Sequence, residues 1–281
     1  MRVAVFGATG VLGRQVVPRL VECRHEVVAV ARSPEAAAKL GRIGAQPRLA
    51  DILRPETIGP VIEGCDAVAH LATAIPPPGP ARNWELNDQV RRDGTANLVR
   101  EARRLGVRRY LQQSIAHLAA GYGESWVDET TPLRPSRVTQ SAADMEATVG
   151  RSGLDWCILR GGIFYGDASG WDERLRRQAR AGALAYPANA EQYVSLIRVA
   201  DMARAVVAAL EAQLGEGTLL ITDDEPVRYR VLFDYLCALE GAPAPSAASA
   251  EVLPSCRASN ARSRRELGWA PLYPTYRSGL A

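Results

Sequence analysis

The sequence predicts an α/β fold in which a doubly wound parallel sheet carries a smaller C-terminal substrate-binding lobe. Two observations predict the sheet. Over the first 160 residues, short apolar runs alternate with longer helical patterns, a succession typical of a parallel sheet covered by helices on both faces. The first apolar run also leads straight into a glycine-rich turn, FGATGVLG at 6–13, and then into a helix. The mixed pattern beyond residue 160 predicts the second lobe.

The strands and helices of the first lobe follow in order along the chain. Gly106 ends a helical pattern over 86–105, since glycine readily takes the left-handed conformation that closes a helix. Two further helical patterns run from the glycine turn to about Cys23 and over 136–149. The strands between the helices are predicted at 2–7, 26–31, 47–52, 66–72, 108–114 and 155–161. We therefore expect residues 1–160 to form the sheet-bearing core.

The rest of the chain, 161–281, mixes both types of pattern and is expected to be mainly the substrate-binding lobe. Within it, the segment 193–222 is expected to return to the core. A proline run at 75–81 stiffens the loop after the fourth strand, at the sheet edge where doubly wound folds bind ligands. The patterns of the second lobe are strands at 193–197 and 217–222, helices at 200–213 and 228–240, and a loop at 241–255.

Composition excludes several classes of protein. With 47% hydrophobic and 23% charged residues, the chain is typical of soluble globular proteins. It has no apolar run of the roughly 18 residues that a membrane helix needs, and its first residues enter a strand with no room for a signal peptide. The net charge of +3 does not favour nucleic acid. Five cysteines without a CxxC spacing predict reduced thiols in a cytoplasmic protein, and no metal-ligand spacing is present.

The glycine turn predicts a Rossmann dinucleotide site. Gly7, Gly10 and Gly13 lie between a strand and a helix, where such glycines permit a tight turn, close approach of a pyrophosphate and close helix packing. The second strand then ends in Arg32 and Ser33, where NAD-binding sites carry an acidic residue. Because an arginine fork matches a phosphate, we expect NADPH to be preferred over NADH.

Taken together, these segments resemble the extended or atypical short-chain dehydrogenase/reductase family, in its epimerase-like branch, nearly end to end. The segments that carry the resemblance are GATGVLG (7–13), ADI (50–52), HLATA (70–74), DGTANLVREARRLGVRRYLQQS (93–114), LDWCILRGGIFYG (154–166), IRVADMARAVVAALE (197–211) and SRRELGWAP (263–271). The cofactor-binding residues that the resemblance implies are Gly7, Thr9, Gly10, Val11, Leu12, Gly13, Arg32, Ser33, Asp51, Ile52, Leu71, Ala72, Thr73, Gly162 and Ile163.

The chain departs from the family at the catalytic pair. The family's helix carries YxxxK in a context like YxxSKxxxE, and VTQSAADME aligns with it, so that Val138 replaces the tyrosine and Ala142 the lysine. No shift of alignment restores the lysine, because Lys39 is the one lysine among the 34 basic residues. The family's paired serines appear as Ser114 and Ile115, with Ile115 at the catalytic position. The resemblance thus implies an intact cofactor site without its usual proton donor.

Other side chains could stabilise an alkoxide as it forms. Ser114 is the candidate catalytic residue, since it would lie beside the nicotinamide, although a serine that binds the backbone is an equal alternative. His117 has a suitable ordinary pKa, but a loop histidine facing water is the favoured interpretation. For Tyr122 and Tyr165 we favour packing, for His70 a hydrogen-bonded core position, and for His25 an exposed one. Trp84, Trp126 and Trp171 either line the cleft for a flat aromatic ligand or pack as ordinary tryptophans.

Three functions remain open. The favoured one is an NADPH-dependent ketoreductase of a small, polycyclic aromatic ketone of the polyketide type, such as an angucyclinone, protonated by the substrate or by water. The abundance of Arg, Ala, Gly and Pro, which indicates a GC-rich genome, favours antibiotic-type secondary metabolism. The alternative is a non-catalytic NADP(H)-binding redox sensor. An epimerase, dehydratase or isomerase is disfavoured, because those reactions depend most on a resident acid and base.

Overall fold

The computed structural model describes residues 1–281 except 78–81, 122, 213 and 250–253. The described chain divides into two compact units. Unit 1 comprises Met1–Ser114, Pro135–Leu159 and Ala203–Thr218, and unit 2 comprises Ile115–Arg134, Arg160–Met202 and Leu219–Ala281.

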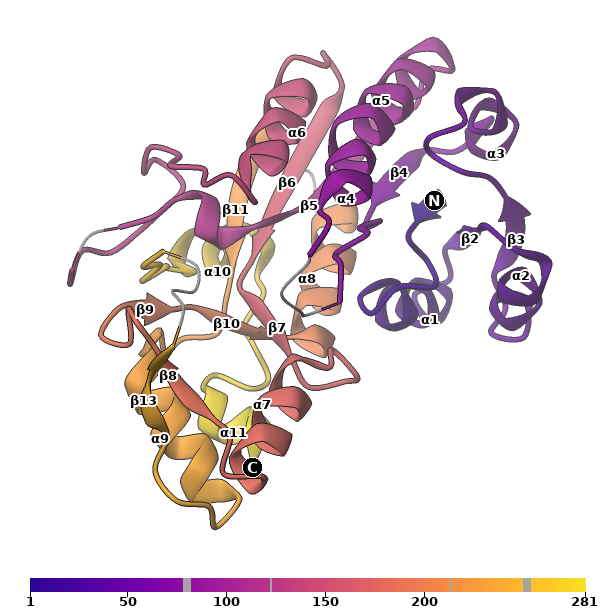
Figure 1. Cartoon of the computed structure of the whole chain (residues 1–281). Helices are drawn as coiled ribbons and strands as arrows, with labels where there is room; N and C mark the ends of the chain where they lie inside the picture. Colours follow the sequence, from indigo (N-terminus) through magenta and orange to yellow (C-terminus); the bar gives the residue numbers. More distant parts are fainter. Residues whose placement is uncertain (78–81, 122, 213, 250–253) are drawn as a thin grey trace. The chain divides into compact units, whose positions relative to one another are not determined.

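The central sheet has seven strands in the order β11–β6–β5–β4–β1–β2–β3 (Figure 1). The pairs from β3 to β5 run parallel, so the predicted doubly wound sheet is confirmed. The strand order reverses between β1 and β4, which is the point where such sheets bind ligands at the carboxyl ends of their strands. The strands are β1 (Arg2–Phe6), β2 (Glu26–Ala31), β3 (Gln46–Leu49), β4 (Ala67–His70), β5 (Arg109–Ile115), β6 (Asp155–Gly161) and β11 (Gly217–Ile221).

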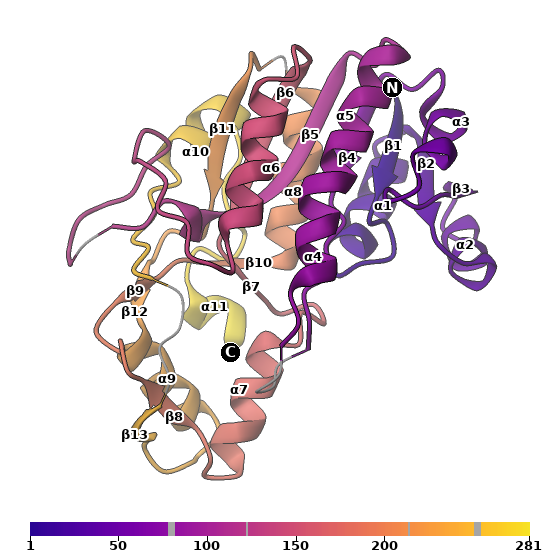
Figure 2. The same ribbon diagram turned by 45° about the horizontal axis from the view of Figure 1, so that its top comes forward.

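Helices cover the strands, and α5 and α6 lie side by side across one face of the sheet (Figure 2). Beneath them is an apolar core in which Phe6, Ile58, Leu98 and Tyr110 are almost fully buried. The helices are α1 (Gly13–Glu22), α2 (Pro34–Gly41), the 3-10 turn η1 (Pro55–Thr57), α3 (Gly59–Ile62), α4 (Glu85–Gln89), the π-helical turn η2 (Val90–Gly94), α5 (Thr95–Arg104), α6 (Gln140–Gly150) and α8 (Val199–Glu211).

Two predicted helices have different bounds. The helix predicted over 86–105 is interrupted by η2, which places Gly94 so close to the core that a Cβ atom there would lie 2.4 Å from Ile52 Cδ1. The helix predicted over 136–149 begins only at Gln140. Its first residues instead form a turn in which the Ser136 N–H donates to Thr139 Oγ1 at 2.8 Å. Val138 therefore precedes α6 rather than lying on it.

Unit 2 contains three two-stranded sheets, β10–β7, β12–β9 and β13–β8. The strand predicted over 193–197 is two strands, because Ser195 between them donates to the Cys256 carbonyl and accepts from the Ala258 N–H, both at 2.9 Å. The loop predicted over 241–255 contains β13. The elements are η3 (Ala116–Leu118), β7 (Ile163–Tyr165), α7 (Trp171–Arg180), β8 (Ala185–Pro187), β9 (Tyr193–Val194), β10 (Leu196–Arg198), β12 (Val227–Arg228), α9 (Tyr229–Leu239), β13 (Ser246–Ser249), α10 (Ala261–Leu267) and α11 (Tyr276–Leu280).

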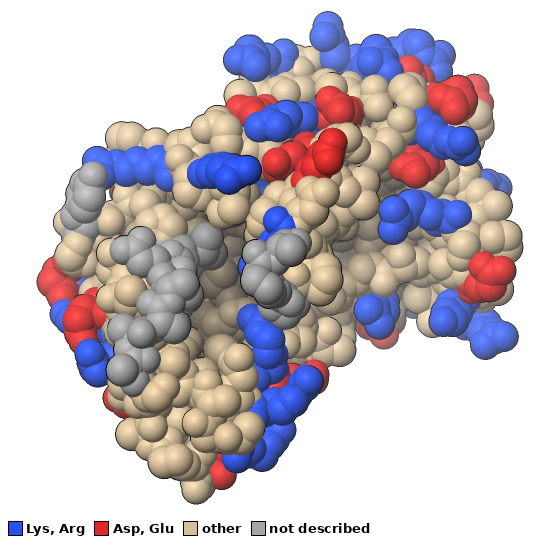
Figure 3. Space-filling model, in the orientation of Figure 1, with Lys and Arg blue, Asp and Glu red and all other residues tan. Residues whose placement is uncertain are grey.

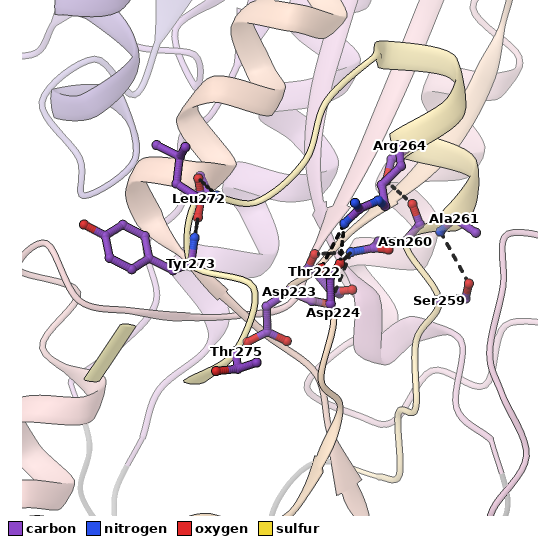
Figure 4. Close-up of polar contacts among 12 residues, drawn as sticks. Thr222, Asp223, Asp224, Ser259, Asn260, Ala261, Arg264, Leu272, Tyr273 and Thr275 are labelled. Atoms are coloured by element: carbon purple, nitrogen blue, oxygen red, sulfur yellow. Dashed lines mark hydrogen bonds and ion pairs between the residues drawn. The ribbon is translucent and has the colours of Figure 1, made fainter. Parts of the chain in front are cut away.

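The segment after β11 is held by a polar network within unit 2 (Figure 4). Asn260 Nδ2 donates to the Thr222 carbonyl at 2.9 Å and to Asp224 Oδ1 at 2.7 Å. Arg264 forms an ion pair with Asp224 at 2.7 Å. Asp223 stands apart from these bonds, since it is 1% exposed and its carboxylate oxygens have no hydrogen-bond partner among the described residues.

The surface and composition of the described residues add three findings. Basic and acidic side chains are interspersed on the face drawn in Figure 3. No helix among the described residues is long and apolar enough to cross a membrane, and none of their side chains form a metal-ligand cluster. All five cysteines are free thiols, four of them buried.

Candidate active site

The turn between β1 and α1 is so tight that two of its glycines admit no side chain. Gly7 has a φ of +89°, and a Cβ atom on it would lie 2.6 Å from the backbone nitrogen of Ala72. A Cβ atom on Gly13 would lie 2.1 Å from the Gly7 carbonyl oxygen. The first distance shows that the turn lies directly against the residues after β4, and the second shows that α1 starts directly against the turn. This is the geometry that a pyrophosphate-binding turn requires.

The N-terminal end of α1 presents backbone donors. Gly10 N–H donates to the Gly7 carbonyl at 3.0 Å, but among the described residues the N–H groups of Val11 and Leu12 donate to no backbone carbonyl. Leu12, at the N-cap, provides no side-chain bond, and the first turn contains no acidic residue. Free N–H groups and the positive end of the helix dipole suit an anion, so this loop, with exposed Thr9 and Gly10, fits the phosphates of a dinucleotide.

The residues predicted to hold the adenosine lie at the ends of β2 and β3. Arg32 is exposed, and its guanidinium has no partner among the described residues. Ser33 caps α2 by accepting the Ala36 N–H at 3.3 Å. Asp51 accepts the Leu53 N–H at 2.9 Å through Oδ1, and Ile52 is 6% exposed within the core. Arg32 is therefore the charged group of this set that is free to meet a ligand.

The residues predicted to run along the cofactor fall in both units. In unit 1, Leu71 N–H donates to the Phe6 carbonyl at 2.9 Å, which extends the β4 pairing beyond the strand. Leu71, Ala72 and Thr73 thus continue from the end of β4 beside the glycine turn, at the switch point of the sheet. In unit 2, the N–H groups of Gly162 and Ile163 donate to the carbonyls of Ile221 and Ser195, at 3.0 and 2.9 Å. The approach of Gly162 and Ile163 to a nicotinamide stays a prediction.

Ser114 lies near the end of β5, as predicted, and forms a buried pair with a residue that the sequence did not single out. Its hydroxyl donates to Glu146 Oε1 of α6 at 2.6 Å, and the two residues are 2% and 6% exposed. A serine hydroxyl has one hydrogen, and Glu146 Oε1 accepts it. In this state Ser114 can accept a hydrogen bond from a ligand but has none to donate.

The start of α6 contains no acid. Ala142 is fully buried, and Val138 is partly buried in the turn before the helix. A buried cation, Arg91 of η2, contacts this region: its Nη1 atom donates to the Val138 carbonyl at 3.4 Å and to Ser141 Oγ at 3.3 Å. The sequence does not single out Arg91, because its position within a helical pattern carries no signal of burial.

A cavity of about 930 Å³ opens in unit 1 between α4, η2 and the turn before α6. Trp84 and Val138 line it. The guanidinium of Arg82 stacks over the Trp84 ring at 5.5 Å. Trp84 therefore lines a cavity, whereas Trp126 is 54% exposed and Trp171 packs against the core of unit 2.

The remaining histidine candidates include one prediction that was wrong. His117 does not face water but is 1% exposed in η3, and neither ring nitrogen has a partner among the described residues. Burial lowers its pKa to about 4. His70 is a fully buried core residue, as predicted, with Nδ1 3.0 Å from Gln112 Oε1, and burial lowers its pKa to about 4. His25, predicted exposed, is partly buried beside Glu211 at 3.0 Å.

Of the two tyrosine candidates, Tyr165 lies in a described core and Tyr122 does not belong to the described residues. Tyr165 is fully buried in the core of unit 2, as the packing interpretation predicted. Burial raises the pKa of its phenol. Tyr122 lies outside the described residues. None of His70, His117 and Tyr165 therefore offers a proton donor with an ordinary pKa.

Comparisons with known proteins agree with this geometry. A family model described as NAD(P)H-binding matches residues 7–213. The chain is 33% identical to a 3-diazoavenalumate denitrifying reductase of a Streptomyces species, over 100% of this chain and 99% of the relative. It is 27% identical to a 4-hydroxy-2-methyl-3-oxo-4-farnesyl-3,4-dihydroquinoline-1-oxide ketoreductase of Stigmatella aurantiaca, over 86% of this chain and 74% of the relative.

Solved structures share the fold at low sequence identity. The UDP-glucose 4-epimerase of Thermus thermophilus, in complex with NAD, matches with a TM-score of 0.82 and 21% identity, over 100% of this chain and 96% of that one. A dTDP-glucose 4,6-dehydratase of Streptomyces venezuelae, with NAD bound, matches with a TM-score of 0.83 and 21% identity, over 100% and 95%. These likenesses concern the fold alone.

Proposed function

Because the chain belongs to the NAD(P)H-binding family, whose model spans residues 7–213, we propose that it reduces a small aromatic substrate with NADPH and donates no proton from its own side chains. The coarser part is established by its reductase relatives: the chain is an NAD(P)H-dependent oxidoreductase of epimerase-like fold. The absence of a resident proton donor rests on one observation, the loss of both acid–base positions at Val138 and Ala142.

The preference for NADPH rests on Arg32. Its guanidinium is exposed, has no partner among the described residues and follows the second strand, where a 2′-phosphate would lie. Fluorescence titration with NADPH and NADH tests the preference. Arg32→Ala should weaken NADPH binding about tenfold or more, as expected for a charge-assisted phosphate contact, and should leave NADH binding unchanged. An equal loss for both cofactors would remove Arg32 from the site.

The substrate must tolerate a site without an acid. The cofactor supplies hydride when it is bound, and a ketone that receives hydride also needs a hydrogen bond on its oxygen. A hydroxyl beside the carbonyl can provide one, since it arrives in position with the substrate. Ser114 could orient such a hydroxyl by accepting its hydrogen bond, because Glu146 already holds the serine hydrogen. The relative that reduces a hydroxylated oxo-quinoline supports a polycyclic hydroxyketone.

A diazo arene is the second candidate, and the full-length relative favours it. An aryl diazonium group that gains hydride forms a C–H bond as its C–N bond breaks, and the electron pair of that bond leaves on N₂. No oxygen acquires charge in this exchange, so no acid is required. Reduction of a diazo arene therefore accounts for Val138 and Ala142 more simply than ketone reduction does.

One experiment separates these alternatives. Catalytic amounts of the protein are mixed with NADPH and, in turn, 3-diazoavenalumate, which the relative's name gives as its substrate, and a hydroxylated polycyclic ketone. Consumption of NADPH with stoichiometric N₂ identifies the diazo substrate, and a secondary alcohol identifies the ketone. A matched ketone without the neighbouring hydroxyl should react far more slowly. Tight NADPH binding without turnover of any substrate would instead support the redox sensor.

A further inference from the structure

We propose that Arg91 is a resident positive charge of the reduction site, which favours negative charge on the substrate by acting through the turn before α6. The role rests on the proposed function, because it takes this turn to be the wall beside the nicotinamide. Arg91 is a positioning residue in this account, since it contacts the turn and not the substrate.

Arg91 is a buried cation held by neutral groups. It is 5% exposed, and the two acceptors of its Nη1 atom are the Val138 carbonyl and the Ser141 hydroxyl. It forms no ion pair among the described residues. Burial lowers the pKa of Arg91, and the nearby carboxylate of Asp88 partly opposes this by raising it. Asp88 Oδ1 is itself buried and has no hydrogen-bond partner among the described residues.

This arrangement is unfavourable for stability. Buried charges in proteins are normally paired, because taking an ion out of water costs several kcal/mol. The N-terminal end of a helix is also the positive end of its dipole. A cation beside the start of α6 is therefore repelled by that dipole. The turn that places Arg91 there is π-helical, a conformation that is rare and frequent at functional sites.

The same arrangement favours anionic chemistry. A guanidinium keeps its proton at any physiological pH, so Arg91 adds a fixed positive potential at Val138 and Ser141. Such a potential stabilises charge that develops on a substrate, and it costs no reorganisation during the reaction. The chain has one lysine, Lys39 of α2. Arg92, which pairs with Asp144 of α6 at 2.6 Å, is exposed, so Arg91 differs from it in being a buried cation beside this turn.

Two substitutions separate charge from hydrogen bonding. Arg91→Lys keeps the charge and loses the fork, whereas Arg91→Gln keeps an amide donor and loses the charge. Arg100→Gln is the matched control, because Arg100 lies on the exposed face of α5 and donates to Asn97 Oδ1 at 2.9 Å. Thermal melting of each variant confirms that it folds.

The first readout is cofactor binding and needs no substrate. The oxidised nicotinamide ring is cationic and the reduced ring is neutral, so Arg91 should weaken the binding of NADP⁺ relative to NADPH. Arg91→Gln should lower the ratio of the NADP⁺ and NADPH dissociation constants about tenfold, as expected for two charges at an intermediate effective dielectric. Arg91→Lys and Arg100→Gln should keep the wild-type ratio within about twofold.

The second readout is turnover of whichever substrate is identified. With a hydroxyketone, the Arg91 charge opposes the positive charge that the nicotinamide gains and favours the negative charge that the substrate oxygen gains. A kcat that falls in Arg91→Gln at unchanged KM and returns in Arg91→Lys supports the proposal, because it shows that the charge acts on the substrate, whereas a kcat that rises in Arg91→Gln overturns it. An unchanged ratio of dissociation constants in Arg91→Gln overturns the proposal, as does an Arg91→Lys variant that matches Arg91→Gln in both readouts. If the ratio of dissociation constants shifts in Arg91→Gln but no substrate is turned over, the charge of Arg91 beside the nicotinamide is supported and the proposed function is refuted instead.

Discussion

Lowering the pH from about 7.5 to about 4 should destabilise this protein mainly through His70 and His117. Both are essentially fully buried, and burial lowers each pKa from 6.5 to about 4. Between these values the unfolded chain binds more protons than the folded one, so stability falls as the pH falls. Between pH 7.5 and 4 a difference of this size corresponds to about 3 kcal/mol per histidine, or about 6 kcal/mol for both. That is a large part of the 5–15 kcal/mol typical of a native protein.

Urea unfolding of the wild type and of His117→Leu at several pH values measures the part of this pH-dependent loss of stability that is due to His117. Leucine breaks no hydrogen bond of the described residues at this position. The stability difference between variant and wild type should therefore shift in favour of the variant by about 3 kcal/mol between pH 7.5 and 4. Identical pH dependences in the two proteins would refute the burial argument. The same pKa leaves only about 0.1% of His117 protonated at pH 7, so it is a poor general acid there.

Three further outcomes are expected. Burial raises the pKa of Asp223 well above its usual value, so the folded state binds the extra proton and stability is lost as the pH rises above about 3.8. Asp223→Asn should therefore gain about 1–3 kcal/mol over wild type at pH 7.5 and little at pH 3.5, measured by urea unfolding. In Gly13→Ala the new Cβ would lie 2.1 Å from the Gly7 carbonyl oxygen, so this variant should lose NADPH binding in calorimetry. In Gly10→Ala the corresponding distance is 3.2 Å, so this variant should fold normally. Val138→Ala should cost about 1 kcal/mol of packing and keep most turnover in a steady-state assay; a loss as large as that of a catalytic group would show that Val138 does more than line the site.

The parts of this structure that sequence predicts are those fixed by local pattern. The sheet and the glycine turn follow from apolar runs and from Gly7 and Gly13, because strand burial and tight turns leave direct marks on residue type. The hydrogen bonds of the candidate site that the sequence does not predict join residues that are distant in the chain. Ser114 meets Glu146, which is 32 residues away, and Arg91 meets Ser141, which is 50 residues away. No periodicity records such contacts, and a π-helical turn changes which side of a helix is buried.

The burial of His117 could not be read from its neighbours for the same reason. Ala116 and Leu118 mark the segment as apolar, but a histidine between them is compatible with either a surface turn or a buried one. The structure places the turn inside a small cluster that includes Ala116, Val127 and Leu220. Strands and loops far apart in the chain decide its burial, and with it the pKa that rules the ring out as a donor.

The separation of cofactor binding from proton transfer has a consequence for specificity. In a site with a resident acid, any carbonyl that reaches the hydride can be reduced, so selection depends on shape. In the proposed site the glycine turn and Arg32 would hold the cofactor, while Val138 in the turn before α6, Ala142 in its first turn and the charge of Arg91 would replace the usual acid and base. If the proposed function holds, a substrate must bring its own hydrogen-bond donor, or need none because it releases N₂, to complete the reaction. An ordinary ketone of the right shape should bind and fail to react, so rejection occurs at the chemical step rather than at binding. Competitive inhibition by unreactive ketones, with kcat near zero and an inhibition constant close to the substrate KM, is the kinetic signature of that arrangement, and efficient turnover of simple ketones would contradict it.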